Sequence, residues 1–152
     1  MTRIDFYVLP ALRLDAREQF AARLAAKAVR AGQRALLLCD DEAARARLAE
    51  RLWGLPGAFM PSAPLRAPEA SAAPILLALE SELDALGTAP FPVHEWLINL
   101  RLERSAHFAA FDRVAEIICQ DDAVREAGRA HYRFYRERGY PLHHHDLKDR
   151  EA

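Results

Sequence analysis

The chain has 152 residues, of which 51% are apolar and 28% are charged, and its formal net charge is −1. This balance is that of an ordinary globular domain, and a chain of this length can bury a core without disulfides or structural metals. The nearly neutral total argues against a protein that coats nucleic acid through bulk charge.

The first third of the chain alternates predicted strands and helices. Residues Arg3 to Leu9 are rich in β-branched and aromatic side chains and end at a proline, which predicts a strand. Asp15 and Glu18 resemble a capping box at the start of a helix, and Gly32 suits the position just after its end. The unbroken apolar run from Ala35 to Cys39 is typical of a strand buried on both faces.

A second helix follows directly. Asp40 or Asp41 can cap this helix, which extends to Trp53. Strands and helices that alternate with short connections predict a parallel sheet with right-handed crossovers. Residues 54–74 contain five of the nine prolines and predict a long loop instead of a regular element.

The remainder of the chain continues the α/β pattern. The segment from Ile75 to Leu79 suits a third strand, although the longer segment 75–87 also suits a helix. We expect strands at Trp96 to Leu100 and at Val114 to Cys119, with a short helical turn at His107 to Asp112 between them.

The predicted architecture is a single α/β domain over residues 1–152. It is a three-layer sandwich with a mainly parallel, roughly five-stranded sheet, Rossmann-like but without a nucleotide-binding glycine loop. The loop at about 54–74 and a flexible C-terminal tail at about 143–152 are expected to lie outside the regular elements.

A nucleotide cofactor is not predicted. A dinucleotide site needs a glycine-rich turn after the first strand, because only glycine lets the backbone approach the pyrophosphate, and residues Leu9 to Arg13 contain none. Asp40 stands where a ribose-binding acid would be, but without the glycine turn we interpret it as a helix cap. The chain also lacks a P-loop motif.

A metal centre and a catalytic nucleophile are not predicted either. His143, His144, His145 and Asp146 are consecutive, and adjacent residues rarely converge on one ion, so we interpret them as a solvated tail. No serine stands in the glycine-flanked turn of a hydrolase nucleophile. We therefore expect no catalytic residue, no metal ligand and no cofactor.

The expected location is the cytoplasm, without a membrane attachment. Residues 1–10 do not form a secretory signal, and no apolar run reaches membrane-spanning length. Cys39 and Cys119 both lie in apolar surroundings, which predicts buried free thiols in a reducing compartment.

The last predicted helix, which is capped by an aspartate at 121–122 and ends at Gly139, has an uneven distribution of charge. At about 100° per residue, one side presents Arg125, Arg129, Tyr132, Arg133 and Arg136. The other, apolar side presents Val124, Ala127, His131, Phe134 and Tyr135, which we expect to pack against the core, with His131 as a packed and not a catalytic histidine. Because arginine recognises carboxylates and phosphates through paired hydrogen bonds, the first side predicts an anion-binding surface. The alternative is an arginine face that meets only solvent.

Two large aromatic residues lie near the end of the second helix. Trp53 is at the helix end and Phe59 is in the proline-rich loop. Such a loop cannot easily bury two large rings, so we interpret them as an exposed anchor for a partner protein. The alternative is that both rings cap the core.

Several sequence blocks, taken in order and spacing, point to a known family. They are FYVL at 6–9, G-x-R-A-L-L-L-C at 32–39, RLW with a following F-x-P at 51–61, WLINL at 96–100, FDRVAEII at 111–118 and HYRFYRERGYPL at 131–142. In these blocks the chain resembles the chi subunits of bacterial DNA polymerase III holoenzyme. The resemblance implies an α/β fold without a nucleotide and an accessory subunit without its own active site, although the holoenzyme is a DNA-directed DNA polymerase.

The resemblance also implies a partner for the basic side of the last helix. Chi subunits link the clamp loader to single-stranded DNA-binding protein (SSB), which ends in an acidic tail with apolar last residues and a free carboxylate. The family's tail-binding residues match Arg125, Arg129, Tyr132 and Arg133. Guanidinium groups would bind the carboxylates, and the ring would shelter the terminal apolar side chain.

A second partner implied by the resemblance is the psi subunit of the polymerase. The family's psi-binding surface matches Trp53 and Phe59, and it stays open whether a helicase uses the same surface. The chain departs from the family at Ser62, where relatives often have histidine, and residues 63–95 match poorly.

Two rival functions belong to other classes. The basic side of the last helix could bind single-stranded DNA or RNA directly, since arginines with interleaved aromatics can follow a phosphate backbone. One tyrosine on one helix is a small stacking surface, however, and we expect contact with DNA to be mainly indirect. A nucleotide-dependent enzyme is the other rival, and the missing glycine turn argues against it.

Overall fold

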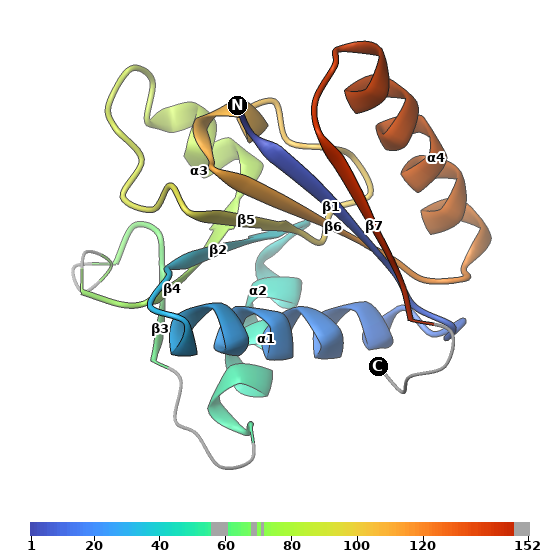
Figure 1. Cartoon of the computed structure of the whole chain (residues 1–152). Helices are drawn as coiled ribbons and strands as arrows, with labels where there is room; N and C mark the ends of the chain where they lie inside the picture. Colours follow the sequence, from blue (N-terminus) through green and yellow to red (C-terminus); the bar gives the residue numbers. More distant parts are fainter. Residues whose placement is uncertain (56–60, 68–69, 71, 148–152) are drawn as a thin grey trace.

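The computed structural model describes residues 1–55, 61–67, 70 and 72–147 (Figure 1). Among these residues a single seven-stranded sheet lies between two layers of helices, and every paired strand runs parallel to its neighbour. The strands, in the order β3-β4-β2-β5-β6-β1-β7 across the sheet, are β1 (Arg3–Val8), β2 (Ala35–Cys39), β3 (Ser62–Pro64), β4 (Ile75–Leu79), β5 (Trp96–Asn99), β6 (Arg113–Ile118) and β7 (Leu142–Asp146).

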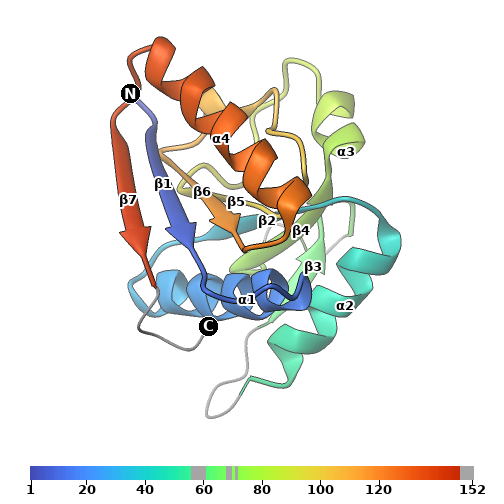
Figure 2. The same cartoon turned by 90° about the vertical axis from the view of Figure 1, so that its right-hand side faces the viewer.

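Helices cover both faces of the sheet (Figures 1 and 2). They are α1 (Asp15–Arg30), α2 (Glu42–Trp53), α3 (Glu80–Ala85), α4 (Asp122–Glu137) and the short 3₁₀ helix η2 (Phe108–Ala110). One apolar core lies between the sheet and the pair α1 and α2, and a second lies between the sheet and the pair α3 and α4. This arrangement confirms the predicted three-layer Rossmann-like class.

The sheet has two more strands than the roughly five predicted. β3 (Ser62–Pro64) lies inside the segment predicted as a loop, and β7 (Leu142–Asp146) lies inside the segment predicted as a flexible tail. The expectation of a flexible tail is therefore wrong for residues 143–146. Both are edge strands that pair with one neighbour only, β4 and β1 respectively. These strands form through backbone hydrogen bonds to their neighbours, and their short polar or proline-containing sequences give no alternating apolar pattern.

The ambiguous segment 75–87 contains both predicted alternatives in succession. The buried strand β4 ends at Leu79, and α3 begins at Glu80. The backbone N–H of Leu79 donates to Oε1 of Glu82 at 3.0 Å, and the guanidinium of Arg45 binds the same carboxylate at 2.6 Å. This buried ion pair connects α2 to α3 at the carboxyl end of β4.

Helix starts and ends follow the sequence, with one exception. Asp41 caps α2 and Asp121 caps α4, each by accepting a hydrogen bond from the backbone three residues later. The predicted capping box at Asp15 and Glu18 is wrong. The preceding Leu14 already has helical backbone angles, so Asp15 lies inside the helix, and the two acids bind Arg13 and Arg47 instead.

Two glycines end helices as predicted. Gly32 follows α1 with a φ of 82°, and Gly139 follows α4 with a φ of 77°. These left-handed conformations are readily adopted by glycine. No helix in the described parts of the chain is both long and apolar enough to cross a membrane.

Candidate binding groove on the last helix

The inward side of α4 is fixed by a buried polar cluster. Oε2 of Glu116 on β6 accepts a hydrogen bond from the hydroxyl of Tyr135 at 2.9 Å. Its Oε1 lies 3.1 Å from Nδ2 of Asn99 and 3.2 Å from Nδ1 of His131. Burial, and then the neighbouring carboxylate, raise the pKa of the Tyr135 hydroxyl well above its usual range, so it stays a donor. The predicted packing of His131 is confirmed, whereas sequence reasoning missed Glu116.

The packed side of α4 differs in detail from the predicted one. Val124, Gly128, His131 and Tyr135 are its buried residues. Phe134 was expected to be buried but is only half-buried. The guanidinium groups of Arg104 and Arg138 lie over its ring, at 3.4 and 3.8 Å from the ring centroid. These cation–π contacts cover the part of the ring that does not pack against Phe108 and Tyr135.

A glycine sets the distance between α4 and the sheet. A Cβ atom at Gly128 would lie only 2.7 Å from Cδ1 of Ile118, so any larger residue would require a shift. Beside this close approach, the ring of Tyr132 lies against that of Phe6, with centroids 5.4 Å apart. The missing side chain thus lets α4 pack closely on Ile118, and next to Tyr132 a space remains whose base is formed by strand residues.

This space is a groove of about 520 Å³ between α4 and the strands β1, β6 and β7. Its lining residues are Phe6, Val8, Ile118, Gln120, Arg125, Gly128, Arg129, Tyr132 and His144. The strand side chains and Gly128 give it an apolar base, and two arginines, a glutamine and a histidine give it a polar rim. Such a mixture suits a ligand that is partly apolar and partly anionic.

Three of the four residues predicted for this surface meet at the groove. Arg125, Arg129 and Tyr132 line it, whereas Arg133 is exposed on α4 and is not among its lining residues. Sequence reasoning missed Gln120 and His144. Gln120 precedes the helix, and His144 lies in the segment predicted as a tail, so only the pairing of β7 with β1 brings it here.

The guanidinium groups at the groove are not neutralised within the described parts of the chain. Arg125 and Arg133 have no ion pair there, and Arg129 lies 3.6 Å from Glu126. Both side chains of that pair are mostly exposed, at 59% and 72%, and exposed pairs contribute little. Arg136 lies over Tyr132 at 5.7 Å from the ring centroid. The positive charge of this side of α4 is therefore available to an external anion.

The second predicted surface lies on the opposite side of the sheet. Trp53 is the last residue of α2 and is 71% exposed, as predicted for an anchor. Phe59 lies outside the described residues, so the proposed pair is represented by Trp53 alone. Because α2 and α4 cover different faces, the two surfaces are separated by the sheet (Figure 1).

A pocket of about 320 Å³ at the carboxyl ends of the strands occupies the position of a nucleotide site in related folds. Its lining includes Asp40 together with Asp41 and Asp121. The last two cap the amino ends of α2 and α4, where a phosphate would otherwise bind. A phosphate there would meet carboxylates. The residue that caps α2 is Asp41 and not Asp40, between which the sequence left the choice open.

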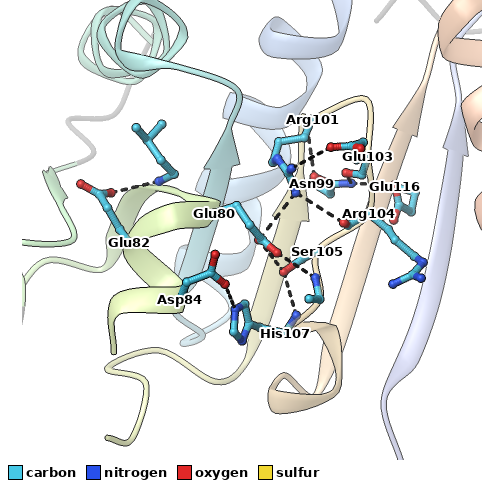
Figure 3. Close-up of polar contacts among 12 residues, drawn as sticks. Glu80, Glu82, Asp84, Asn99, Arg101, Glu103, Arg104, Ser105, His107 and Glu116 are labelled. Atoms are coloured by element: carbon cyan, nitrogen blue, oxygen red, sulfur yellow. Dashed lines mark hydrogen bonds and ion pairs between the residues drawn. The ribbon is translucent and has the colours of Figure 1, made fainter. Parts of the chain in front are cut away.

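Three possible metal ligands meet between α3 and the segment before η2. Oxygen atoms of Glu80 and Asp84 and a ring nitrogen of His107 lie within 4.8 Å of one another (Figure 3). The two oxygens of Glu80 already accept hydrogen bonds from Ser105 Oγ and Ala106 N, both at 2.8 Å, and His107 Nε2 lies 2.6 Å from Asp84. These contacts attach the segment before η2 to α3, and they account for the close approach of the three side chains without a bound ion.

The consecutive histidines near the C-terminus lie on strand β7 and do not form a solvated tail. Because successive strand residues point to opposite faces, His144 reaches the groove beside α4, whereas His145 packs on the α1 side. Nε2 of His145 lies 2.8 Å from the buried Asp5, and its ring stacks on Tyr7 with centroids 4.4 Å apart. Strand geometry thus separates adjacent histidines.

The family model and the most similar relatives in sequence indicate the same family. The sequence model of the family described as DNA polymerase III chi subunit, HolC, matches residues 1–143. DNA polymerase III subunit chi of Pseudomonas aeruginosa is 45% identical over 148 residues, which cover 97% of this chain and 98% of that protein. The chi subunit of Escherichia coli is 29% identical over 130 residues, 85% of this chain and 84% of the relative.

Solved structures with a similar fold are more distant in sequence. A chain from the crystal structure of the E. coli DEAD-box protein SrmB bound to regulator of ribonuclease activity A has a TM-score of 0.56 and 10% identity, and covers 98% of this chain and 93% of that chain. The Mss116p DEAD-box helicase domain 2, bound to an RNA duplex, has a TM-score of 0.58 and 12% identity, over 96% of this chain and 64% of that one. At such identities the similarity concerns the fold alone.

Proposed function

The chain belongs to the chi subunit family of DNA polymerase III, and on that premise we propose that it is a non-catalytic adaptor in DNA replication. It would link the clamp loader, through the psi subunit, to the acidic C-terminal tail of SSB. Its contact with DNA would then be mainly indirect, and its location would be the cytoplasm, with the replication machinery. On the same premise it would be an accessory subunit of the polymerase, without an active site of its own.

The observation that carries the proposal is the convergence of Arg125, Arg129 and Tyr132 on one groove. Among the described residues Arg125 has no ion pair and Arg129 has only an exposed one with Glu126, and the groove has an apolar base. A tail with acidic residues, apolar last residues and a free carboxylate matches both properties. The arginines would pair with carboxylates, and Tyr132, Phe6 and Ile118 would pack against the last side chains.

A binding titration tests this proposal. A labelled peptide with the sequence of the SSB tail is added to the full chain, and its fluorescence anisotropy is measured at several salt concentrations. We expect saturable binding that weakens as salt increases, because exposed charge pairs are screened. The same peptide with an amidated C-terminus should bind at least about tenfold more weakly if its terminal carboxylate is bound by arginine, since hydrogen bonds to charged groups contribute about 1.5–3 kcal/mol.

The rival proposal, direct binding of single-stranded nucleic acid by α4, is separated by competition. An unlabelled oligothymidylate should leave the bound peptide in place. If instead the oligonucleotide displaces the peptide and binds more tightly, the basic side of α4 is a nucleic-acid site and the adaptor proposal fails.

The psi-binding surface is tested with variants on the other side of the sheet. We expect Trp53→Ala and Phe59→Ala to weaken co-purification with psi while leaving the affinity for the tail peptide unchanged. A helicase that used the same surface would compete with psi and would be affected by the same variants. Loss of both psi and peptide binding in one variant would indicate a misfolded protein, which circular dichroism detects.

A further inference from the structure

A second pocket lies across the sheet from the groove beside α4. Its volume is about 400 Å³, and it lies between α1 and the edge of the sheet formed by β1, β6 and β7. Helices α1 and α4 pack into different cores, one on each face of the sheet. The pocket and the groove share strand β7, with His145 lining the former and His144 the latter.

The walls of this pocket carry positive charge without an acidic lining residue. Arg23 and Lys27, one turn apart on α1, are exposed and have no ion pair among the described residues. Arg113 lies deeper, with its guanidinium bonded to the buried Asp5 at 2.8 Å and placed 4.1 Å from the ring centroid of Trp96. Asp5 offsets one of these charges, and the pocket remains cationic.

The exposed cationic side chains of α1 that have no ion pair among the described residues are confined to one half of the helix. Near the amino end, Asp15 and Glu18 bind Arg13, Arg47 and Arg51 from neighbouring segments. Charges there are paired across elements. Two like charges at positions i and i+4 repel each other by a few tenths of a kcal/mol, and Arg23 and Lys27 are left in that arrangement.

An aromatic stack forms the strand side of the pocket. The imidazole of His145 lies flat on the ring of Tyr7, with centroids 4.4 Å apart and planes 9° apart, and Phe20 packs against Tyr7 at 5.3 Å. The side chain of His145 is one-third exposed and lines the pocket, so the stack ends at a flat ring next to the cationic side chains. A second flat ring could continue this stack.

We propose that this pocket binds single-stranded nucleic acid, with a base on the His145–Tyr7 stack and the adjoining phosphates on Arg23 and Lys27. A phosphate next to a planar base needs a cationic group beside an aromatic face, which is how sequence-tolerant single-strand sites are built. An acidic peptide would satisfy the cations but not the ring. The site is distinct from the groove for the proposed tail, so both ligands bind at the same time.

The test uses the full chain and a fluorescently labelled oligothymidylate. Because Arg23 and Lys27 are exposed helix residues, the double variant R23E/K27E is expected to fold. It should lose at least tenfold in oligonucleotide affinity. The slope of log affinity against log salt should become shallower by about 1.4, since each lost phosphate contact on a single strand contributes about 0.7. The matched control is Arg30→Glu, which changes the charge of the same helix outside the pocket lining and should change the affinity less than twofold.

Competitors identify the chemical source of the phosphate. Inorganic phosphate and thymidine monophosphate should displace the oligonucleotide only at far higher concentration. His145→Ala should weaken binding of the oligonucleotide and the monophosphate much more than binding of inorganic phosphate, because it removes the stacking surface in addition to the contact with Asp5. Equal competition by inorganic phosphate, or an equal loss in R30E and in R23E/K27E, would overturn the proposal in favour of a simple anion site or of non-specific charge.

The outcome is independent of the adaptor proposal. The tail peptide is measured with the same variants, and R23E/K27E should bind it as the unmodified chain does. Arg129→Ala should in turn leave oligonucleotide affinity unchanged. If R129A abolishes oligonucleotide binding and R23E/K27E does not, the nucleic acid binds on α4 and the pocket beside α1 is not its site.

Discussion

The hydroxyl of Tyr135 donates a hydrogen bond of 2.9 Å to Oε2 of Glu116, both buried between α4 and β6. This contact fixes the inward side of the helix whose outward side carries the arginines. Removing the hydroxyl leaves a buried carboxylate oxygen without this donor. We expect Tyr135→Phe to lower the free energy of unfolding by about 1–3 kcal/mol, measured by urea denaturation.

The matched control for that variant is Tyr140→Phe. Tyr140 packs near Tyr135, with ring centroids 6.4 Å apart, but its hydroxyl has no hydrogen bond among the described residues. Its loss should cost less than about 0.5 kcal/mol, as is usual away from buried polar contacts. Equal stability of the two variants would show that the Glu116 contact is not a net stabilising one.

Arginines on α4 should differ in their importance for the proposed tail. Arg125 and Arg129 line the groove, whereas Arg133 does not. We expect Arg125→Ala and Arg129→Ala each to weaken peptide binding by about 1–3 kcal/mol, and Arg133→Ala by less than about 0.5 kcal/mol, because exposed charges outside a contact act mainly through screened attraction. Isothermal titration calorimetry measures these differences. An equal effect of all three would mean that general charge, and not the groove, governs binding.

Gly128→Ala should reduce the affinity for the tail peptide with little effect on the stability of the fold. Alanine is favoured over glycine within a helix by about 1 kcal/mol, but its Cβ would lie 2.7 Å from Cδ1 of Ile118. The end of the Ile118 side chain can move, so we expect the free energy of unfolding to change by less than about 1 kcal/mol. Ile118 also lines the groove, and its displacement should reduce peptide affinity.

Two measurements check this expectation, denaturation for stability and anisotropy for binding. The control is Gly54→Ala, at the end of α2, where the nearest atom to an added Cβ is a backbone oxygen at a comfortable 3.5 Å. That variant should bind the tail peptide as the unmodified chain does. Unchanged peptide affinity in G128A would mean that Ile118 makes no contact with the tail.

Stability should fall in acid partly because of Asp5. Burial alone would raise the pKa of this carboxyl, but hydrogen bonds from His145, Arg113 and Arg3 outweigh burial and lower the pKa below its usual value of 3.8. Because the pKa of this carboxyl is lower in the folded than in the unfolded chain, its ionisation stabilises the fold at pH values above the unfolded-state pKa. This stabilisation is lost as the pH falls through the folded-state pKa. Asp5→Asn should therefore be less stable at pH 7 and show a smaller decline below about pH 4. Urea midpoints as a function of pH measure this, with the exposed Asp112→Asn as control.

Thiol chemistry gives a test of the sheet itself. Cys39 ends the buried strand β2, and burial raises the pKa of its thiol to about 12. A thiol without thiolate at neutral pH does not react. We expect no labelling of Cys39 by Ellman's reagent in the native protein, and labelling of both Cys39 and Cys119 in guanidinium chloride. Rapid native labelling at Cys39 would contradict the burial of β2.

Sequence periodicity predicted the elements that bury apolar side chains. β2 coincides with the run from Ala35 to Cys39, and α4 (Asp122–Glu137) follows the predicted aspartate cap and ends just before Gly139. The strands β3 and β7 were not predicted, because edge strands form by backbone pairing and need no apolar alternation. Helix α1 begins at Asp15, close to the predicted start, but the predicted capping box is absent, because Asp15 and Glu18 pair with arginines and not with backbone N–H groups.

The candidate site was predictable only where it follows helical spacing. Arg125, Arg129 and Tyr132 were identified from the helical wheel, because one helix presents them at regular intervals. Gln120 and His144 join them from other elements, and no local pattern links residues so far apart in the sequence. The buried Glu116 was missed for a related reason, since its partners on β5 and α4 are brought together only by the fold.

The fixation of α4 by Glu116 and by the close approach of Gly128 to Ile118 has a kinetic consequence. A ligand that reaches the groove finds the helix that carries the arginines already in place, so the encounter requires no helix rearrangement. Association rates should then follow long-range charge and decrease with salt, while groove variants should differ chiefly in how fast a bound ligand departs. The exchange of ligands at this groove should therefore be limited by the dissociation rate of the bound ligand and not by a conformational change of the protein.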